Sequence, residues 1–147
     1  MPTKKYLNLS NAQKYTFIFI GVGLLLALGI WFSILGKPSF EITFSLSNLT
    51  AIASMYLSGF FLSRYMDYMI NKRKFNELLV GIAGSYIILI IGIIAGSSVN
   101  AYENSYYENS ALKVFLDYFY TPLIIVLAVG GIPTLILGSI LGRMIKN

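Results

Sequence analysis

Residues 78–96 read LLVGIAGSYIILIIGIIAG, and this stretch decides the fold of the chain. It contains no charged side chain, and its length is close to the roughly 20 apolar residues that a helix needs to cross a bilayer. Backbone N–H and C=O groups find no water in the hydrocarbon core, so a spanning segment of this kind must satisfy them within a helix. The stretch therefore predicts a transmembrane α-helix.

Three other stretches are also long and predominantly apolar, and they cover residues 15–35, 49–69 and 122–141. Across the 147 residues, 56% are hydrophobic and only 12% are charged. This is about half the charged fraction of an average soluble domain. We therefore expect an all-α integral membrane protein, a single membrane domain over residues 1–147 built as a bundle of four transmembrane helices.

The basic residues are unevenly distributed between the connections, and this distribution indicates an orientation. Nine of the 11 precede the first span, lie at the end of the second span or after it, or follow the fourth: Lys4, Lys5, Lys14, Arg64, Lys72, Arg73, Lys74, Arg143 and Lys146. Lys37 and Lys113 alone fall on the opposite side. Connections rich in Lys and Arg stay in the cytoplasm. We therefore expect both termini in the cytoplasm and the protein in the plasma membrane.

The net charge of +5 follows from this topology, and we expect no nucleic-acid partner. The short run Lys72, Arg73 and Lys74 is typical of a juxtamembrane contact with anionic lipid headgroups. Arg64 and Asp67 lie three residues apart at the same end of the second span. We expect these two side chains to form an ion pair at the membrane interface, where long side chains extend toward water.

Small side chains recur at four-residue spacing in three of the predicted spans. They are Thr50, Ser54 and Ser58 in the second span, Gly92 and Gly96 in the third, and Gly138 and Gly142 in the fourth. Such spacing lets helix backbones approach closely in lipid, so we interpret all three sets as helix-packing faces. The hydroxyl groups of the second span have an alternative interpretation as the polar lining of a permeation path.

The sequence Gly130-Gly131-Ile132-Pro133 falls near the middle of the fourth span. Pro133 removes a backbone donor and its ring clashes with the preceding turn, and the two glycines make bending easier. We expect a hinge or kink here. A passive kink and a functional one both fit, because broken helices line binding sites in several transporter folds.

Local signals predict where the helices begin. Ser10 and Gln13 have the spacing of a capping box. Residues 40–47 alternate apolar and polar side chains, which favours an extended segment, and Ser47 is then the expected cap of the second helix. Residues 111–120 place apolar side chains at helical spacing, which predicts a short amphipathic helix lying in the outer interface. Thr121 and Pro122 are expected to start the fourth span afresh.

The residue types exclude much chemistry. The chain has no histidine and no cysteine, the side chains that supply most metal ligands and acid–base groups. Serine and threonine nucleophiles need a base partner, and no histidine is present to provide it. We therefore expect no cofactor, no metal site and no catalytic residue, and we expect that the protein is not an enzyme.

Two functions remain, and they belong to different classes. The first is an accessory or structural subunit of a larger membrane protein complex, whose partners are membrane lipids and other transmembrane subunits. The alternative is a homo-oligomeric pore, holin-like, or a small lipid or solute carrier that uses the kinked fourth span. In that case the partners are copies of the chain itself.

Overall fold

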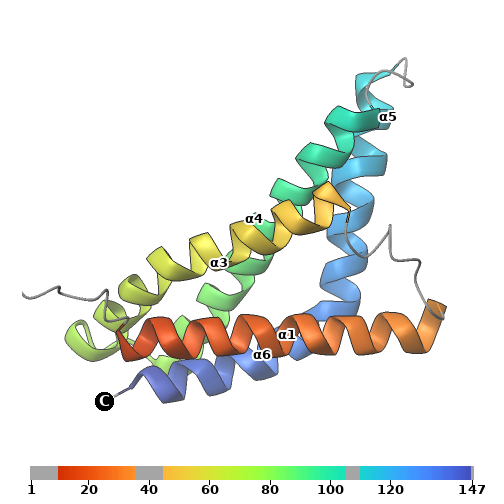
Figure 1. The fold of residues 1–147 in the computed structure, drawn as a ribbon. Coiled ribbons are helices and arrows are strands. Elements are labelled where there is room, and N and C mark those ends of the chain that lie inside the picture. The colour runs from red at the N-terminus through yellow and green to blue at the C-terminus, as the bar shows by residue number, and fades with distance from the viewer. Residues whose placement is uncertain (1–9, 36–44, 105–109, 147) are drawn as a thin grey trace, which may run out of the picture.

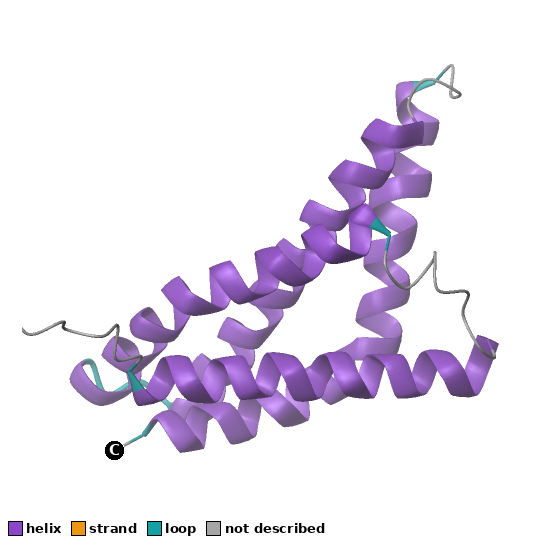
Figure 2. Ribbon diagram, in the orientation of Figure 1, coloured by secondary structure: helices purple, strands orange, loops and turns teal. Residues whose placement is uncertain are grey.

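The structure is a computed structural model that describes residues 10–35, 45–104 and 110–146. Within these ranges the chain is helical and contains no strand (Figure 2). The elements are α1 (Asn11–Leu35), α3 (Leu46–Asp67), the π-helical turn η1 (Tyr68–Lys72), α4 (Glu77–Asn104), α5 (Ala111–Phe115), the π-helical turn η3 (Leu116–Tyr120) and α6 (Thr121–Ile145). Four helices are long and apolar enough to cross a membrane, so the prediction of four such helices is confirmed.

Helix α4 packs against two helices (Figure 1). Helix α3 lies beside it, and α6 contacts it at both ends. Helix α6 changes direction sharply near its middle, and its second half runs beside the first half of α1 (Figure 1). The beginning of α1, the η1–α4 connection and the end of α6 lie together (Figure 1). We call this the basic end, since it holds Lys14, Lys72, Arg73, Lys74, Arg143 and Lys146.

The capping box at the start of α1 is confirmed. The Ser10 hydroxyl accepts a hydrogen bond from the Gln13 N–H at 3.3 Å, and the Gln13 side-chain oxygen accepts one from the Ser10 N–H at 2.9 Å. The Gln13 amide also donates to the Phe60 carbonyl of α3 at 3.3 Å. Gln13 is buried, so the residue that starts α1 also fixes it to its neighbour.

The predicted start of the second helix is wrong by two residues. Ser45 is the cap, and its hydroxyl accepts from the Asn48 N–H at 3.3 Å. Ser47 lies inside α3 and instead donates to the Gly96 carbonyl of α4 at 2.8 Å, because the close approach of the two helices puts that carbonyl within reach. Of the predicted extended segment, Leu46 and Ser47 are helical, and residues 40–44 lie outside the described residues.

The predicted interfacial helix at residues 111–120 is not a separate element. Elements α5, η3 and α6 follow one another without a break, and Tyr120 keeps helical dihedral angles (φ −68°, ψ −48°). Thr121 therefore does not cap a new helix, and its hydroxyl donates to the Leu116 carbonyl at 2.9 Å. A π-helical turn absorbs one extra residue per turn, which lets the helix continue into Pro122.

Helices α4 and α6 cross in backbone contact at the basic end. Gly81, Gly138 and Gly142 are all buried there. A Cβ atom on Gly81 would overlap the Gly138 carbonyl oxygen, and one on Gly142 would overlap the carbonyl oxygen of Glu77. Only glycine fits at these positions, because the obstructing atoms belong to the backbone of the neighbouring helix.

Helices α3 and α4 also pack through glycine. A Cβ on Gly92 would lie 2.5 Å from the Met55 side chain, and one on Gly96 would lie 3.0 Å from the Ala51 Cβ and the Ser47 carbonyl oxygen. Nearer the basic end, Gly84 faces Met66, which is almost fully buried. The two helices are thus in close contact over several turns.

A hydrophobic cluster joins three of the four helices at the basic end. Its buried residues come from α1, from α3 with η1, and from α6: Ala12, Met66, Ile70, Leu141 and Ile145. Tyr15, Phe19 and Val80 pack against it. The Phe17 ring adds an edge-to-face contact with Tyr56, at 5.5 Å between centroids. This cluster therefore lies at the basic end, and Ile88, Ile93 and Ala101 are buried further along α4.

We predict that Gly142→Ala destabilises the protein, because the added methyl group must displace the Glu77 backbone. Overpacking of a close contact costs about 1–3 kcal/mol. Unfolding in mixed micelles by titration with a denaturing detergent measures this. Gly29→Ala is the matched control, since a Cβ on Gly29 meets nothing within 4 Å. Equal stability of the two variants would contradict the crossing described above.

Candidate functional site

The turn between η1 and α4 is held in a defined shape by backbone hydrogen bonds. The Arg73 N–H donates to the Tyr68 carbonyl at 3.1 Å, and the Phe75 N–H donates to the Met69 carbonyl at 3.0 Å. Between them Lys74 has a φ of 58°, in the left-handed region that favours glycine. Lys74 therefore occupies the position just after the helix end at which glycine is the usual residue.

Asn76 starts the next helix. Its side-chain oxygen accepts hydrogen bonds from the N–H groups of Leu78 and Leu79, at 2.9 and 3.3 Å. This is the side-chain capping that the free N–H groups at a helix start require. Asn71, on the other side of the turn, donates its amide to the Asp67 carboxylate at 2.8 Å and to the Ile145 carbonyl at 2.9 Å. The turn is thereby attached to the end of α6.

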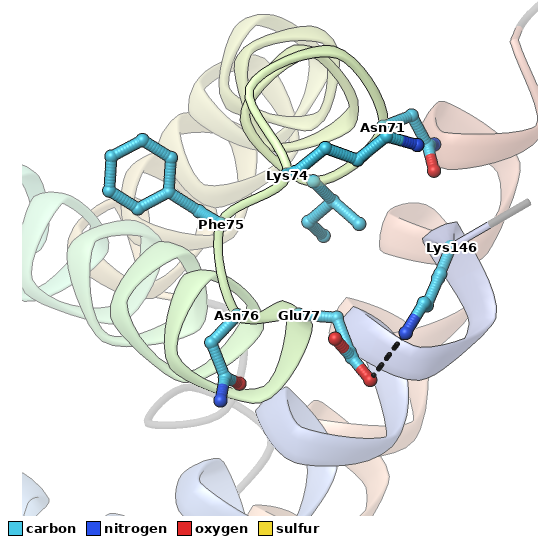
Figure 3. Close-up of a pocket in the computed structure, with 7 residues that line it drawn as sticks. Asn71, Lys74, Phe75, Asn76, Glu77 and Lys146 are labelled. Carbon is cyan, nitrogen blue, oxygen red and sulfur yellow. Dashed lines mark hydrogen bonds and ion pairs between the residues drawn. The ribbon is translucent and has the colours of Figure 1, made fainter.

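A pocket of about 280 Å³ opens between this turn and the end of α6 (Figure 3). It is lined by Ile70, Asn71, Lys74, Phe75, Asn76, Glu77 and Lys146. The Lys146 ammonium group forms an ion pair with the Glu77 carboxylate at 3.1 Å, and both side chains are accessible to solvent. Phe75 projects to the other side of the turn from Lys146 (Figure 3). The pocket lining thus includes two lysines and one glutamate at a helix junction.

The three predicted headgroup lysine and arginine residues take different places. Lys72, Arg73 and Lys74 are all exposed, but only Lys74 lines the pocket. The Arg73 guanidinium donates to the Tyr68 hydroxyl at 3.0 Å and lies over the Tyr68 ring, 5.7 Å from its centroid. Sequence reasoning missed Lys146 as their neighbour, because only the fold brings the end of α6 to this turn.

The predicted ion pair between Arg64 and Asp67 is replaced by other contacts. Asp67 accepts the hydrogen bond from Asn71, one helical turn further on. Arg64 lies over the Phe60 ring, 5.3 Å from its centroid. Asn71 lies four residues after Asp67, and Phe60 lies four residues before Arg64. Each contact is therefore between residues on the same face of the helix. An amide and an aromatic ring thus take the places that we assigned to the ion pair.

The hydroxylic face predicted on the second span lies beside the contact with α4. Thr50, Ser54 and Ser58 are half-buried, and the Ser58 hydroxyl donates to the Met55 carbonyl of its own helix at 3.1 Å. The side chains that α3 presents to Gly92 and Gly96 are those of Ser47, Ala51 and Met55. The face of α3 that contacts α4 is therefore next to the predicted face, displaced from it by one residue around the helix.

The predicted hinge at Gly130, Gly131 and Pro133 lies within α6, and the helix bends in this region (Figure 1). The Tyr86 hydroxyl of α4 donates a hydrogen bond to the Gly131 carbonyl at 2.7 Å. Gly131 is buried, and a Cβ there would lie 3.4 Å from the same hydroxyl. Sequence reasoning missed Tyr86, although a tyrosine in the middle of an apolar span is the signal that points to it.

No protein-family model, no curated protein and no solved structure matches this chain. Function therefore has to be inferred from the side chains and their geometry. Two features carry chemical information: the pocket at the basic end and the bend of α6 against Tyr86. Within the described residues, no group of three or more acidic side chains lies close enough to hold a metal ion.

We predict that Tyr86→Phe destabilises the protein by about 0.6 kcal/mol, the average value of a hydrogen bond between transmembrane helices. The phenylalanine ring keeps the packing and removes only the donor to the Gly131 carbonyl. Unfolding in mixed micelles measures the change. Tyr65→Phe is the control, because Tyr65 is exposed. If both variants unfold alike, the hydroxyl does not support the bend.

Proposed function

We propose that this chain is a small, non-catalytic four-span membrane protein that serves as an accessory or structural subunit of a larger membrane protein complex. In this proposal it lies in the plasma membrane, with both termini and the basic end facing the cytoplasm. The uneven distribution of Lys and Arg supports that orientation. The observation that carries the proposed role is the uncovered second half of α1.

The second half of α1 extends away from the other helices (Figure 1). Up to Gly23 the helix contacts the rest of the chain, since a Cβ on Gly23 would lie 3.6 Å from Leu137. Beyond this point Leu25 is 70% exposed, and Leu26 and Leu28 are also exposed. This half of the helix therefore presents apolar side chains that no other part of the described chain covers.

The same half of α1 carries small residues on an open face. Gly29 has open space where a side chain would be, and the exposed Ser33, four residues on, donates its hydroxyl to the Gly29 carbonyl at 2.8 Å. Because that bond satisfies the hydroxyl internally, the face is suited to close packing against another helix. The pairs Gly92 with Gly96 and Gly138 with Gly142 each meet a helix of this chain, whereas Gly29 faces none among the described residues.

The first half of α6 adds a second uncovered surface. The bend turns this half away from α1 (Figure 1), and Ile132 beside the bend is 71% exposed. Ile124, Ile125 and Val129 are exposed as well. A partner helix placed between the two diverging segments would contact both, and lipid chains would cover the remaining apolar surface.

The non-catalytic part of the proposal is supported by how the buried hydroxyl groups are used. Thr16 donates to the Ala12 carbonyl at 2.8 Å, and Ser63 donates to the Phe60 carbonyl at 3.0 Å. Each hydroxyl bonds to the backbone of its own helix, and a chain without histidine has no imidazole base to activate it. These groups therefore act in helix structure and packing.

The bend of α6 favours a second candidate function, a homo-oligomeric pore or a small lipid or solute carrier. A kink with Gly130, Gly131 and Pro133 and a hydroxyl donor from Tyr86 gives the middle of the membrane a polar, bent backbone, as in several transporters. Purification as a closed homo-oligomer that passes ions or lipids in liposomes would favour this candidate over the accessory subunit. Pro133→Ala should then reduce the flux.

We predict that Gly29→Leu reduces the amount of co-purified partner subunits about tenfold, because a bulky side chain at a close helix contact costs about 1–3 kcal/mol. The chain itself should fold normally, since the added atoms enter open space. Native mass spectrometry after mild extraction from the membrane measures the partner. Ala83→Leu is the matched control, because Ala83 is exposed on α4.

Two results would contradict the proposal. One is a wild-type protein that is extracted as a monodisperse monomer with no other polypeptide. The other is a Gly29→Leu variant that retains its partners as well as Ala83→Leu does.

A further inference from the structure

The pocket at the basic end has the chemistry of an anion site. Its lining includes Lys74 and Lys146, and Glu77 is the one carboxylate in it. Asn71 and Asn76 also line the pocket, but the Asn71 amide donates to Asp67 and Ile145, and the Asn76 oxygen caps α4. Two positive charges and one negative charge leave the lining with an excess of one positive charge. Lys72, Arg73 and Arg143 are exposed nearby on the same end, and they raise the local concentration of anions without lining the pocket.

The depth of the pocket relative to the apolar helices points to a lipid. It opens between the end of α3–η1 and the start of α4, where the predicted spans at residues 49–69 and 78–96 stop. Ile70, which is buried, forms an apolar part of its wall. Phe75 is 55% exposed beside it. A site with cationic groups next to apolar surface fits a phosphate that is attached to an acyl-bearing molecule.

We propose that this pocket binds the phosphate group of an anionic membrane phospholipid, with Lys74 and Lys146 as its principal contacts. Basic pockets between transmembrane helices bind such headgroups in other membrane proteins. The site requires that the helices cross a membrane, as the proposed function does, but it is independent of any partner subunit.

The backbone at Lys74 supports a binding role for this lysine. A left-handed conformation is unfavourable for a non-glycine residue, and glycine would remove that cost at a helix end. Strained positions of this kind gather at binding sites, where the side chain has a function to perform. Here the left-handed conformation falls on a residue of the pocket lining.

The ion pair between Glu77 and Lys146 regulates access to the site. In the structure the Lys146 ammonium group donates to the Glu77 carboxylate at 3.1 Å, so one of its N–H groups is already used. Exposed ion pairs of this kind contribute little stability, so a lipid phosphate can take the place of the carboxylate at little cost to the fold. Removal of the Glu77 charge should therefore tighten lipid binding.

The test is a lipid titration of the full-length protein in mild detergent, followed by native mass spectrometry. Phosphatidylglycerol is compared with phosphatidylcholine of the same acyl chains. Lys74→Asn and Lys146→Gln should each weaken phosphatidylglycerol binding about fivefold, since a lysine near an anionic lipid contributes about 1 kcal/mol. Asparagine is chosen at position 74 because it tolerates the left-handed conformation. Glu77→Gln should tighten binding.

Lys72→Gln is the matched control, because it removes the same charge from an exposed residue outside the pocket. It should change the affinity less than twofold. A loss as large as that of Lys74→Asn would overturn the proposal, since the attraction would then be a diffuse surface effect. Equal binding of phosphatidylcholine would overturn it as well.

Competition with inorganic phosphate shows whether the bound phosphate group belongs to a lipid or to free phosphate in solution. Millimolar phosphate should leave bound phosphatidylglycerol in place, because the lipid also gains from its apolar contacts. Displacement of the lipid would show that the pocket is a site for soluble phosphate and would overturn the assignment to a membrane lipid. The lipid is detected by its own mass, so loss of a partner subunit does not affect this readout.

Discussion

The backbone contact between α4 and α6 determines the arrangement of the basic end. Gly81, Gly138 and Gly142 let the two helices touch without intervening side chains. Apolar side chains gain little from leaving lipid for one another, so close backbone packing of this kind is a main source of helix association in membranes. The contact has a chemical consequence, because it carries the end of α6 to the η1–α4 turn. Lys146 can then meet Glu77, and the Asn71 amide can reach the Ile145 carbonyl.

The second determinant is the bend of α6. A straight α6 would follow one direction from its contact with α4, but Gly130, Gly131 and Pro133 redirect it, and Tyr86 donates to the carbonyl of Gly131 at the bend. The two halves of α6 both contact α4, but they differ in their contact with α1. One half packs with α1 in the hydrophobic cluster, and the other half lies away from α1 (Figure 1). The basic end is consequently packed and polar, whereas the opposite half of the molecule presents the apolar surfaces on which the proposed partner binding rests.

The sequence was sufficient for features that depend on nearby residues. The four long helices follow from uninterrupted apolar length, and the capping box follows from the spacing of Ser10 and Gln13. Features that depend on the crossing of helices were not predictable. Whether Ser47 caps α3 or bonds to Gly96 depends on how near α4 lies, and whether Thr121 starts a helix depends on the π-helical turn before it. The pocket lies between segments about 70 residues apart, so only the fold could join Lys74 to Lys146.

We propose that the three basic segments, which lie together at the basic end, form one surface on one side of a membrane. The chain contains no cysteine, so single substitutions give clean probes for a membrane-impermeant thiol reagent. Lys14→Cys, Lys74→Cys and Lys146→Cys should all react only from the cytoplasmic side, whereas Ser110→Cys should react only from the opposite side. If any of the three basic-end positions reacted from the same side as Ser110→Cys, the basic segments would not share one side of a membrane.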